Sequence, residues 1–244
     1  MRIKLTLEYD GTNYCGWQVQ PNGVTVQQRV QEALKTLTGE DISVVASGRT
    51  DSGVHAAGQA AHFDTNSSIP PERFAAALNS VLPSDIRALN SERAEDSFHA
   101  RFCAKKKTYR YTAYVSETLR PLWDRYACRL SFSPDILKMK RAARLFVGTH
   151  DFKAFMASGS EVKDTVRTIY SAEVETHGDF ITFTVRGNGF LYNMVRIMTG
   201  TLVEIGAGKM TESDLISALD GGERNLSGKT MPPHGLTLLS VEYR

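Results

Sequence analysis

Apolar and polar residues alternate at every second position in several stretches of the chain, which is the period of a half-buried β-strand. Valine, leucine, isoleucine and tyrosine supply most of the apolar positions. The alternation predicts strands at residues 3–9, 42–47, 59–64, 108–115, 168–175, 180–186 and 236–243.

Helices are predicted between these strands, from apolar residues at helical spacing and from residues that cap helix ends. Thr25 followed by Gln28 indicates a capping-box start, and Gly39 ends the apolar face that follows. Further helices are predicted at 71–80, after Ser133-Pro134, after the Gly-Asn-Gly of 187–189, and from Thr211 to Gly221-Gly222.

Strands and helices do not alternate strictly, so the order favours an α+β fold with mainly antiparallel sheet over a doubly wound parallel sheet. KLTLEYDG near the N-terminus and FTVRGNG in the second half share a strand, a glycine-containing turn and a later helix. We therefore expect two related α/β halves, residues 1–115 and 134–244. Residues 116–133, which lack clear periodicity, are predicted to connect them.

Composition narrows the class of protein only slightly. The 244 residues are 41% hydrophobic and 23% charged, as in ordinary globular proteins, and the net charge is only +2. No apolar run is long enough to cross a membrane, and the start lacks the apolar core of a signal peptide. Three widely spaced cysteines without a CxxC pair suit a reducing compartment. We expect a cytoplasmic protein without a membrane segment.

Residues 98–111, FHARFCAKKKTYRY, concentrate cations and aromatic rings without any acidic residue. The cations are Arg101, Lys105, Lys106, Lys107 and Arg110. Cations neutralise phosphates and aromatic rings stack on exposed bases, so this composition suits a nucleic-acid surface. A solvated strand edge, whose lysines discourage pairing with another strand, is the alternative.

One carboxylate, Asp51, lies in the glycine-flanked stretch ASGRTDSGVHAAGQ, directly after the predicted strand at 42–47. Such a position, on a loop held by a sheet, suits either a turn residue or a reacting group. The pattern of residues leaves both alternatives open.

Motifs for other kinds of site are missing. The chain has no phosphate-binding loop, no complete dinucleotide fingerprint, no GxSxG elbow and no paired metal-ligand histidines. We therefore expect no metal and no nucleotide cofactor. Besides an enzyme that uses Asp51 alone, two alternatives stay open: a non-catalytic RNA-binding module, and a hydrolase that pairs Asp51 with His55.

GRTDSGVHA (48–56) resembles the catalytic motif of the tRNA pseudouridine synthase A family. Further segments resemble other motifs of that family in the same order along nearly the whole chain. They are EYDGTNYCGWQVQP (8–21), FHARFCAKKKTYRY (98–111), GNGFLYNMVRIMTGTLVEIG (187–206) and PPHGLTLLSVEY (232–243). Ser52 departs from the usual alanine, and KKKTYRY from the arginine more common before the tyrosine.

The resemblance implies that the protein isomerises uridine to pseudouridine at positions 38, 39 and 40, in the anticodon stem-loop of tRNA. It also implies two ferredoxin-like or RRM-like halves related by a pseudo-two-fold axis, with an active-site cleft between them. A homodimer that shares one tRNA, without metal or organic cofactor, is implied as well.

The resemblance also implies roles for individual residues. Asp51 is the expected catalytic group; attack on the sugar, attack on the base and removal of the C2′ proton all stay open. Arg196 corresponds to the arginine that pairs with this aspartate. Arg49 is expected to hold the flipped nucleotide or fill the gap that it leaves, and a salt bridge to Asp51 or a phosphate contact is the alternative. Tyr109 is expected to stack on the uracil.

The remaining implied contacts are apolar or electrostatic. Leu236 is expected to form an apolar floor beneath the base, although its periodicity alone fits an ordinary core position. Tyr111 is expected in the core. Phosphate contacts are expected from Arg101, Lys105, Lys106 and Lys107.

Overall fold

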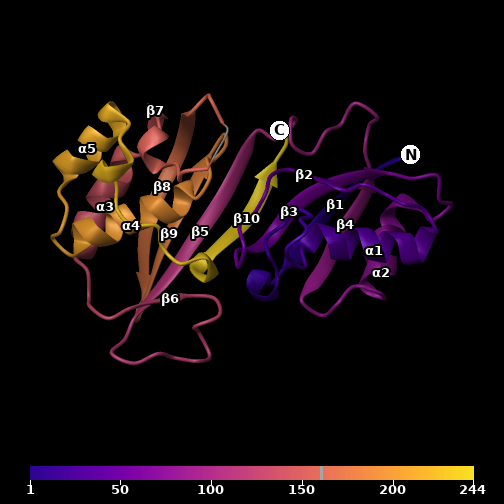
Figure 1. Cartoon of the computed structure of the whole chain (residues 1–244), viewed down its shortest axis with the longest axis horizontal. Coiled ribbons are helices and arrows are strands. Elements are labelled where there is room, and N and C mark those ends of the chain that lie inside the picture. The colour runs from indigo at the N-terminus through magenta and orange to yellow at the C-terminus, as the bar shows by residue number, and fades with distance from the viewer. Residues whose placement is uncertain (160–161) are drawn as a thin grey trace. The chain divides into compact units, whose positions relative to one another are not determined.

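The computed structural model describes residues 1–159 and 162–244 and divides the chain into two compact units (Figure 1). The first unit comprises Met1–Lys105 and Thr237–Arg244, and the second comprises Lys106–Leu236. The boundaries of these units differ from those of the predicted halves, 1–115 and 134–244. The strand that starts at Lys106 belongs to the second unit, and the C-terminal strand returns to the first.

The first unit is built on an antiparallel sheet with one parallel addition. Its strands are β1 (Arg2–Tyr9), β2 (Val45–Ala46), β3 (His55–Asp64), β4 (Ile86–Arg93) and, from Thr237 onward, β10 (Leu236–Glu242). β1 pairs antiparallel with both β3 and β4, and β2 pairs antiparallel with β3. β10 pairs with β3 in parallel. This sheet positions the loop between β2 and β3, which carries Asp51.

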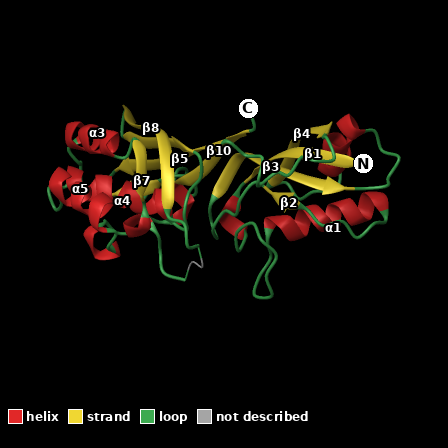
Figure 2. Cartoon of the chain, turned by 90° about the horizontal axis from the view of Figure 1, so that it is seen from above, coloured by secondary structure: helices red, strands yellow, loops and turns green. Residues whose placement is uncertain are grey.

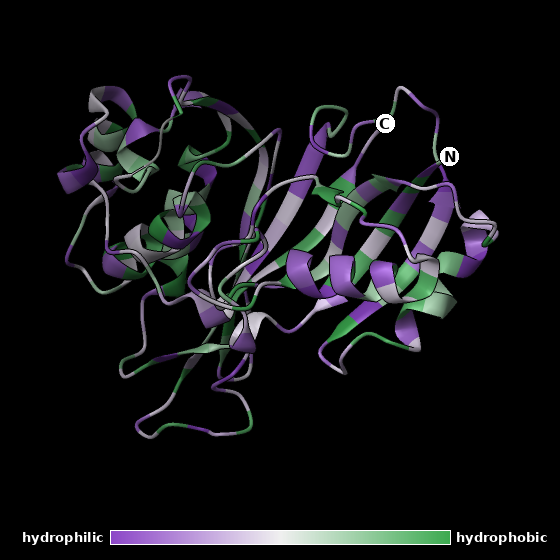
Figure 3. Ribbon diagram, turned by 45° about the vertical axis from the view of Figure 1, so that its right-hand side comes forward, coloured by the Kyte–Doolittle hydropathy of each residue, from purple (hydrophilic) through white to green (hydrophobic). Residues whose placement is uncertain are grey.

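Helices cover one face of this sheet. Ile3, Leu5 and Leu7 of β1 are fully buried, while the residues between them are partly exposed, and Figure 3 shows this alternation of hydropathy along the strands. α1 (Val26–Thr38) lies along the sheet (Figure 2), and α2 (Phe74–Asn79) contacts α1 and β4. The hydrophobic effect therefore places the core between these helices and β1.

The second unit is also a helix-covered antiparallel sheet. β5 (Lys106–Val115) pairs with β9 (Phe180–Gly187), β9 with β8 (Val166–His177), and β8 with β7 (Gly148–Asp151), all antiparallel. A short strand, β6 (Cys128–Leu130), joins β5 in parallel. The helices are α3 (Ile136–Leu145), α4 (Met194–Gly206) and α5 (Glu212–Gly221), and Figure 1 shows them gathered beside β7, β8 and β9. The predicted α+β class, with mostly antiparallel sheets flanked by helices, is confirmed.

The predicted strand at 42–47 is shorter than expected, and the reason is local. The amide of Val44 donates to Oε1 of Gln31 at 3.1 Å, and its carbonyl accepts from Nε2 of Gln27 at 2.8 Å. Side chains of α1 thus satisfy the backbone that a longer strand would use, and only Val45–Ala46 pair with β3.

The helices α1 and α5 begin directly after the capping residues predicted from the sequence. Thr25 caps α1 by accepting from the Gln28 amide, but the Gln28 side chain bonds Glu32, so the predicted capping box is only half formed. At α5, Thr211 and Asp214 form the complete box. The predicted helix at 71–80 begins as a 3-10 turn before α2. No helix in the described ranges has the length and apolar character needed to span a membrane.

Candidate active site

The loop between β2 and β3 is fixed at its start by a buried glutamine. Ser47 Oγ donates to Oε1 of Gln59 at 2.7 Å, and Nε2 of Gln59 donates to the carbonyl of Gly48 at 3.0 Å. Gln59 is fully buried in β3. The side chain that holds the loop is therefore anchored in the sheet.

The middle of the loop is held by the segment that follows β1. The Trp17 amide donates to the carbonyl of Thr50 at 3.0 Å. The hydroxyl groups of Tyr9 and Thr50 are hydrogen-bonded at 2.8 Å. Burial raises the pKa of Tyr9 to about 12, so this hydroxyl keeps its proton at neutral pH. Thr50 is thereby fixed at both its backbone and its side chain.

The end of the loop is held by the carbonyl of Tyr14, which accepts from the Gly53 amide at 3.3 Å and from Ser52 Oγ at 3.2 Å. Gly16 lies against the same loop, with φ of +84°. A Cβ at Gly16 would lie 2.6 Å from the Thr50 carbonyl oxygen, so only glycine permits this close approach. The segment 8–21 therefore clamps the loop that carries Asp51.

Asp51 and Arg49 lie between the clamped positions. Arg49 is exposed and Asp51 is partly exposed, whereas Thr50 between them is buried. Such a loop presents a carboxylate and a guanidinium from fixed backbone, which suits nucleophilic or general-base chemistry on a bound substrate.

His55 is part of the scaffold of this loop. It is 4% exposed, and its Nδ1 accepts from the Gly11 amide at 3.0 Å. The same nitrogen lies 3.2 Å from Oδ1 of Asp10. Both contacts of Nδ1 are to the segment that directly follows β1. The contacts of His55 therefore favour a structural role over an acid–base pair with Asp51.

The second unit contains the predicted tyrosine and its aromatic neighbour. Tyr109, on β5, is 8% exposed, and its ring packs edge-on against Phe190 with centroids 5.1 Å apart. Tyr111 is buried, as expected, and donates from its hydroxyl to the carbonyl of Pro232 at 2.8 Å. Leu236 is also buried. The sequence does not single out Phe190, because its contact with Tyr109 joins residues far apart in the chain.

Arg196 lies on a helix that is otherwise almost completely buried. Every residue of α4 except Arg196 and Glu204 is buried. Nε of Arg196 donates to the Met231 carbonyl at 2.7 Å, and Nη1 donates to Oδ1 of Asn193 at 2.6 Å. Two separate acceptors thus orient the guanidinium, which is the geometry that a fixed positive charge requires.

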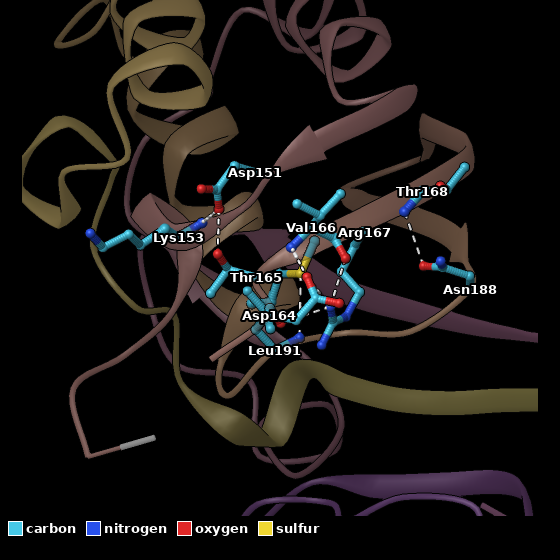
Figure 4. Close-up of polar contacts among 10 residues, drawn as sticks. Asp151, Lys153, Asp164, Thr165, Val166, Arg167, Thr168, Asn188 and Leu191 are labelled. Atoms are coloured by element: carbon cyan, nitrogen blue, oxygen red, sulfur yellow. Dashed lines mark hydrogen bonds and ion pairs between the residues drawn. The ribbon is translucent and has the colours of Figure 1, made fainter. Parts of the chain in front are cut away.

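The turn before α4 is tied to β8, as Figure 4 shows. The amide of Thr168 donates to Oδ1 of Asn188 at 3.0 Å, and the Asn188 amide donates to the Thr168 carbonyl at 3.0 Å. Nearby, Nη1 of Arg167 donates to the carbonyl of Asp164 at 3.0 Å. This bracing fixes the turn that carries Phe190 and leads into the helix of Arg196.

The predicted phosphate-binding residues divide between the units. Arg101 and Lys105 belong to the first unit and are exposed; Lys106 and Lys107 belong to the second and are partly exposed. Nζ of Lys106 lies 5.5 Å from the centre of the Tyr170 ring. Asp51 and Arg49 belong to the first unit, whereas Tyr109, Arg196 and Leu236 belong to the second. Within residues 1–159 and 162–244, His, Cys, Asp and Glu form no group of three that could hold a metal.

Comparison with known proteins gives matches over almost the whole chain. The family model described as tRNA pseudouridine synthase matches residues 6–103 and 142–244. Proteins named tRNA pseudouridine synthase A are similar over nearly their full length. The one from Moorella thermoacetica is 50% identical over 243 residues, and the one from Bacillus pumilus is 48% identical over 245 residues. These alignments cover 99% and 100% of this chain and 99% of each relative.

A weaker similarity connects the chain to a solved structure described as a Cbf5-Nop10-Gar1 complex. The TM-score is 0.39 at 13% sequence identity, and the alignment covers 96% of this chain and 57% of that chain.

Proposed function

The chain belongs to the tRNA pseudouridine synthase family, and we propose that it acts at positions 38, 39 and 40 of the anticodon stem-loop with Asp51 as its catalytic group. Isomerisation of uridine to pseudouridine in tRNA follows from membership of the family. The choice of uridines and the role of Asp51 are the proposal. The resemblance of GRTDSGVHA to the family's catalytic motif supports the role of Asp51, and the full-length similarity to proteins named tRNA pseudouridine synthase A supports the choice of uridines.

The main support for the role of Asp51 is that its loop is held in place by hydrogen bonds on both sides. Bonds from Gln59, Trp17 and Tyr14 fix the loop on both sides of the carboxylate. Catalysis by a single group requires that its position be set before substrate binds, because misplacement by about 1 Å costs about a hundredfold in rate. A turn with no function beyond reversing the chain would not need bonds from two separate segments, β3 and the segment 8–21.

The reaction itself needs only one such group. It breaks the N1–C1′ bond, rotates the uracil and joins C5 to C1′; C5 then loses its proton and N1 takes one up, so the product is an isomer of the substrate. Electrons and atoms balance without a redox partner, so a carboxylate that attacks the sugar, attacks the base or takes the C2′ proton can carry it. In each case Asp51 acts in its ionised form.

The other residues are assigned to binding the extruded nucleotide. Removing a base from its stack costs a few kcal/mol, which contacts to the flipped nucleotide must offset. Arg49, exposed beside Asp51, is proposed to hold this nucleotide or to fill the gap. Tyr109 is proposed to stack on the uracil and Leu236 to support the base. Arg196 is proposed to bind the substrate with its fixed guanidinium.

The cations of the basic segment are proposed to bind tRNA phosphates. Arg101, Lys105, Lys106 and Lys107 would then give affinity without reading the sequence of the RNA.

Release of tritium from tRNA labelled at C5 of uridine tests the reaction and its position. The wild-type protein is expected to release tritium from a tRNA whose uridines at 38, 39 and 40 are labelled. Replacing these three uridines by cytidine, with label retained at uridines elsewhere, is expected to abolish release. Release that persists after the replacement would overturn the assignment to the anticodon stem-loop, and a non-catalytic RNA-binding module would bind tRNA and release nothing.

A homodimer in the cytoplasm is proposed as the active form, on the basis of the resemblance. The three cysteines are free, which agrees with a reducing compartment. Light scattering coupled to size exclusion is expected to give twice the 27.0 kDa chain mass. A mass of one chain at working concentrations would reject the dimer.

A further inference from the structure

Phe102 is distinguished from the other aromatic residues of the segment 98–111 by its exposure. Phe102 is 75% exposed, whereas Tyr109 and Tyr111 are 8% and 1% exposed. Phe98 packs against Tyr243 with centroids 5.0 Å apart. Three aromatic rings of the segment therefore pack against the protein, and the ring of Phe102 is exposed to solvent.

The exposed ring is stacked on one side. Its centroid lies 4.3 Å from that of His99, with the two planes tilted by 32°. The His99 ring in turn lies 4.9 Å from His62, which belongs to β3 and is 5% exposed. Phe102 thus lies at the solvent-exposed end of a row of rings that starts in the sheet.

The backbone beneath this stack is held by several hydrogen bonds. The amides of Arg101 and Phe102 both donate to Nδ1 of His99, at 3.2 and 3.3 Å. The Ala100 amide donates to Nδ1 of His62 at 3.2 Å, and the Ala100 carbonyl accepts from the Tyr243 hydroxyl at 2.9 Å. A ring on so constrained a turn loses little conformational freedom when it binds a partner.

Exposed cations lie close to the ring in space or in sequence. The guanidinium carbon of Arg101 lies 5.8 Å from the centre of the Phe102 ring, and both residues are exposed. Lys105 is also exposed on the same segment. An exposed aromatic ring beside exposed cations is the combination that binds single-stranded nucleic acid, because the ring stacks on a base while the cations bind the phosphates.

We infer that Phe102 is a stacking platform for an unpaired base of the bound tRNA, with Arg101 on a neighbouring phosphate. The inference rests on the proposed function for its RNA substrate, but it assigns a contact away from the reacting atoms. Stacking tolerates every base, since each has a π-face. The platform therefore contributes affinity for tRNA and leaves the chemical step unchanged.

Binding of the wild type and of Phe102 variants to unmodified tRNA tests the platform. Phe102→Leu, which keeps an apolar side chain and removes the ring, is expected to raise Kd by about tenfold or more. Phe102→Trp is expected to bind at least as tightly as the wild type, and its indole fluorescence to be quenched by tRNA. Phe132→Leu is the matched control, because Phe132 is exposed but has no cation within two residues.

The salt dependence of binding separates stacking from charge. Phe102→Leu is expected to keep the slope of log Kd against log salt, whereas Arg101→Gln is expected to lower it by about one phosphate contact. With tRNA saturating, kcat of Phe102→Leu is expected to equal that of the wild type. A Phe102→Leu variant that is folded by circular dichroism and binds tRNA like the wild type would overturn the inference. Wild-type protein that binds tRNA but releases no tritium would instead contradict the proposed function.

Discussion

Arg196 has two hydrogen bonds that a lysine could not reproduce together. Its Nε and Nη1 reach the Met231 carbonyl and the Asn193 side chain, 2.7 and 2.6 Å away. A guanidinium held by a fork of this kind keeps one orientation, whereas an ammonium group on a flexible stem does not. At the scale of single residues, the proposed site therefore depends on the geometry of a charge as well as on its sign.

Arg196→Lys is accordingly expected to lower kcat/KM for tRNA by about tenfold or more, because the loss of hydrogen bonds to a charged group corresponds to about 1.5–3 kcal/mol. Steady-state tritium release measures the effect. Arg224→Lys is the matched control: Arg224 also donates to backbone carbonyls, those of Ser227 and Gly228, but has no proposed part in the site. It is expected to lower Tm and keep kcat/KM. Full activity of Arg196→Lys would remove Arg196 from the site.

At the scale of elements, α4 is packed directly on the backbone of the segment that follows α5. A Cβ at Gly200 would overlap the Lys229 carbonyl oxygen. Thr201 Oγ1 accepts from the Gly228 amide at 2.8 Å on the same side of the helix. Because Met231 follows in this segment and binds Arg196, contact between helix and segment also positions the guanidinium.

Gly200→Ala is expected to reduce the free energy of unfolding by about 1–3 kcal/mol, as overpacking of a close contact does, and to lower kcat. Denaturant unfolding and tritium release measure the two effects. Gly221→Ala, at the end of α5, is the matched control, because its Cβ would meet only Leu226 at an ordinary 3.5 Å. A Gly200→Ala protein as stable as the wild type would contradict the close packing.

Much of the secondary structure could be predicted from local patterns. Alternating apolar and polar residues predicted strands in which every second residue is buried, such as β1 and β9. Capping residues predicted the starts of α1 and α5. β4 was missed because its register shifts against β1 and because Leu89 is exposed while Ser91 is buried. That pattern depends on a tertiary partner, which the sequence of the strand does not contain.

The candidate site was only partly predictable for the same reason. Asp51 stood out because of its glycine-flanked turn, and its neighbours were assigned by resemblance. The clamp formed by Tyr9, Tyr14 and Trp17 could not be predicted, since its bonds to the loop are mainly backbone bonds between distant segments. Phe190 and Phe102 look like ordinary aromatic residues until their exposure and ring contacts are known.

At the scale of the whole molecule, stability is expected to depend on pH through His62. Burial, followed by the positive charges of Arg2 and His99, lowers the pKa of His62. Protonation would also remove the acceptor of the Ala100 amide. The unfolded chain therefore binds this proton more readily than the folded chain. Neutral His62 thus contributes fully to the free energy of unfolding above the ordinary histidine pKa of about 6.5. This contribution is lost as the pH falls from there through the lower pKa of His62 in the folded chain.

The free energy of unfolding, measured with denaturant from about pH 8 to about pH 5, is expected to fall at the acidic end. His62→Gln is expected to flatten this fall, and His177→Gln, at an exposed position, to keep it. A His62→Gln profile parallel to that of the wild type would show that other groups cause the pH dependence.

Tritium release by Asp51→Asn tests directly whether Asp51 is the catalytic group. Asparagine keeps the size of the side chain and removes the charge, so the clamped loop and tRNA binding are expected to persist. Asp41→Asn, which removes an exposed carboxylate paired with Lys35, is the matched control and is expected to react like the wild type. If Asp51 is the catalytic group, Asp51→Asn binds tRNA with a Kd close to that of the wild type and releases tritium at least about a hundredfold more slowly. Release at the wild-type rate by the folded, tRNA-binding variant would contradict this role.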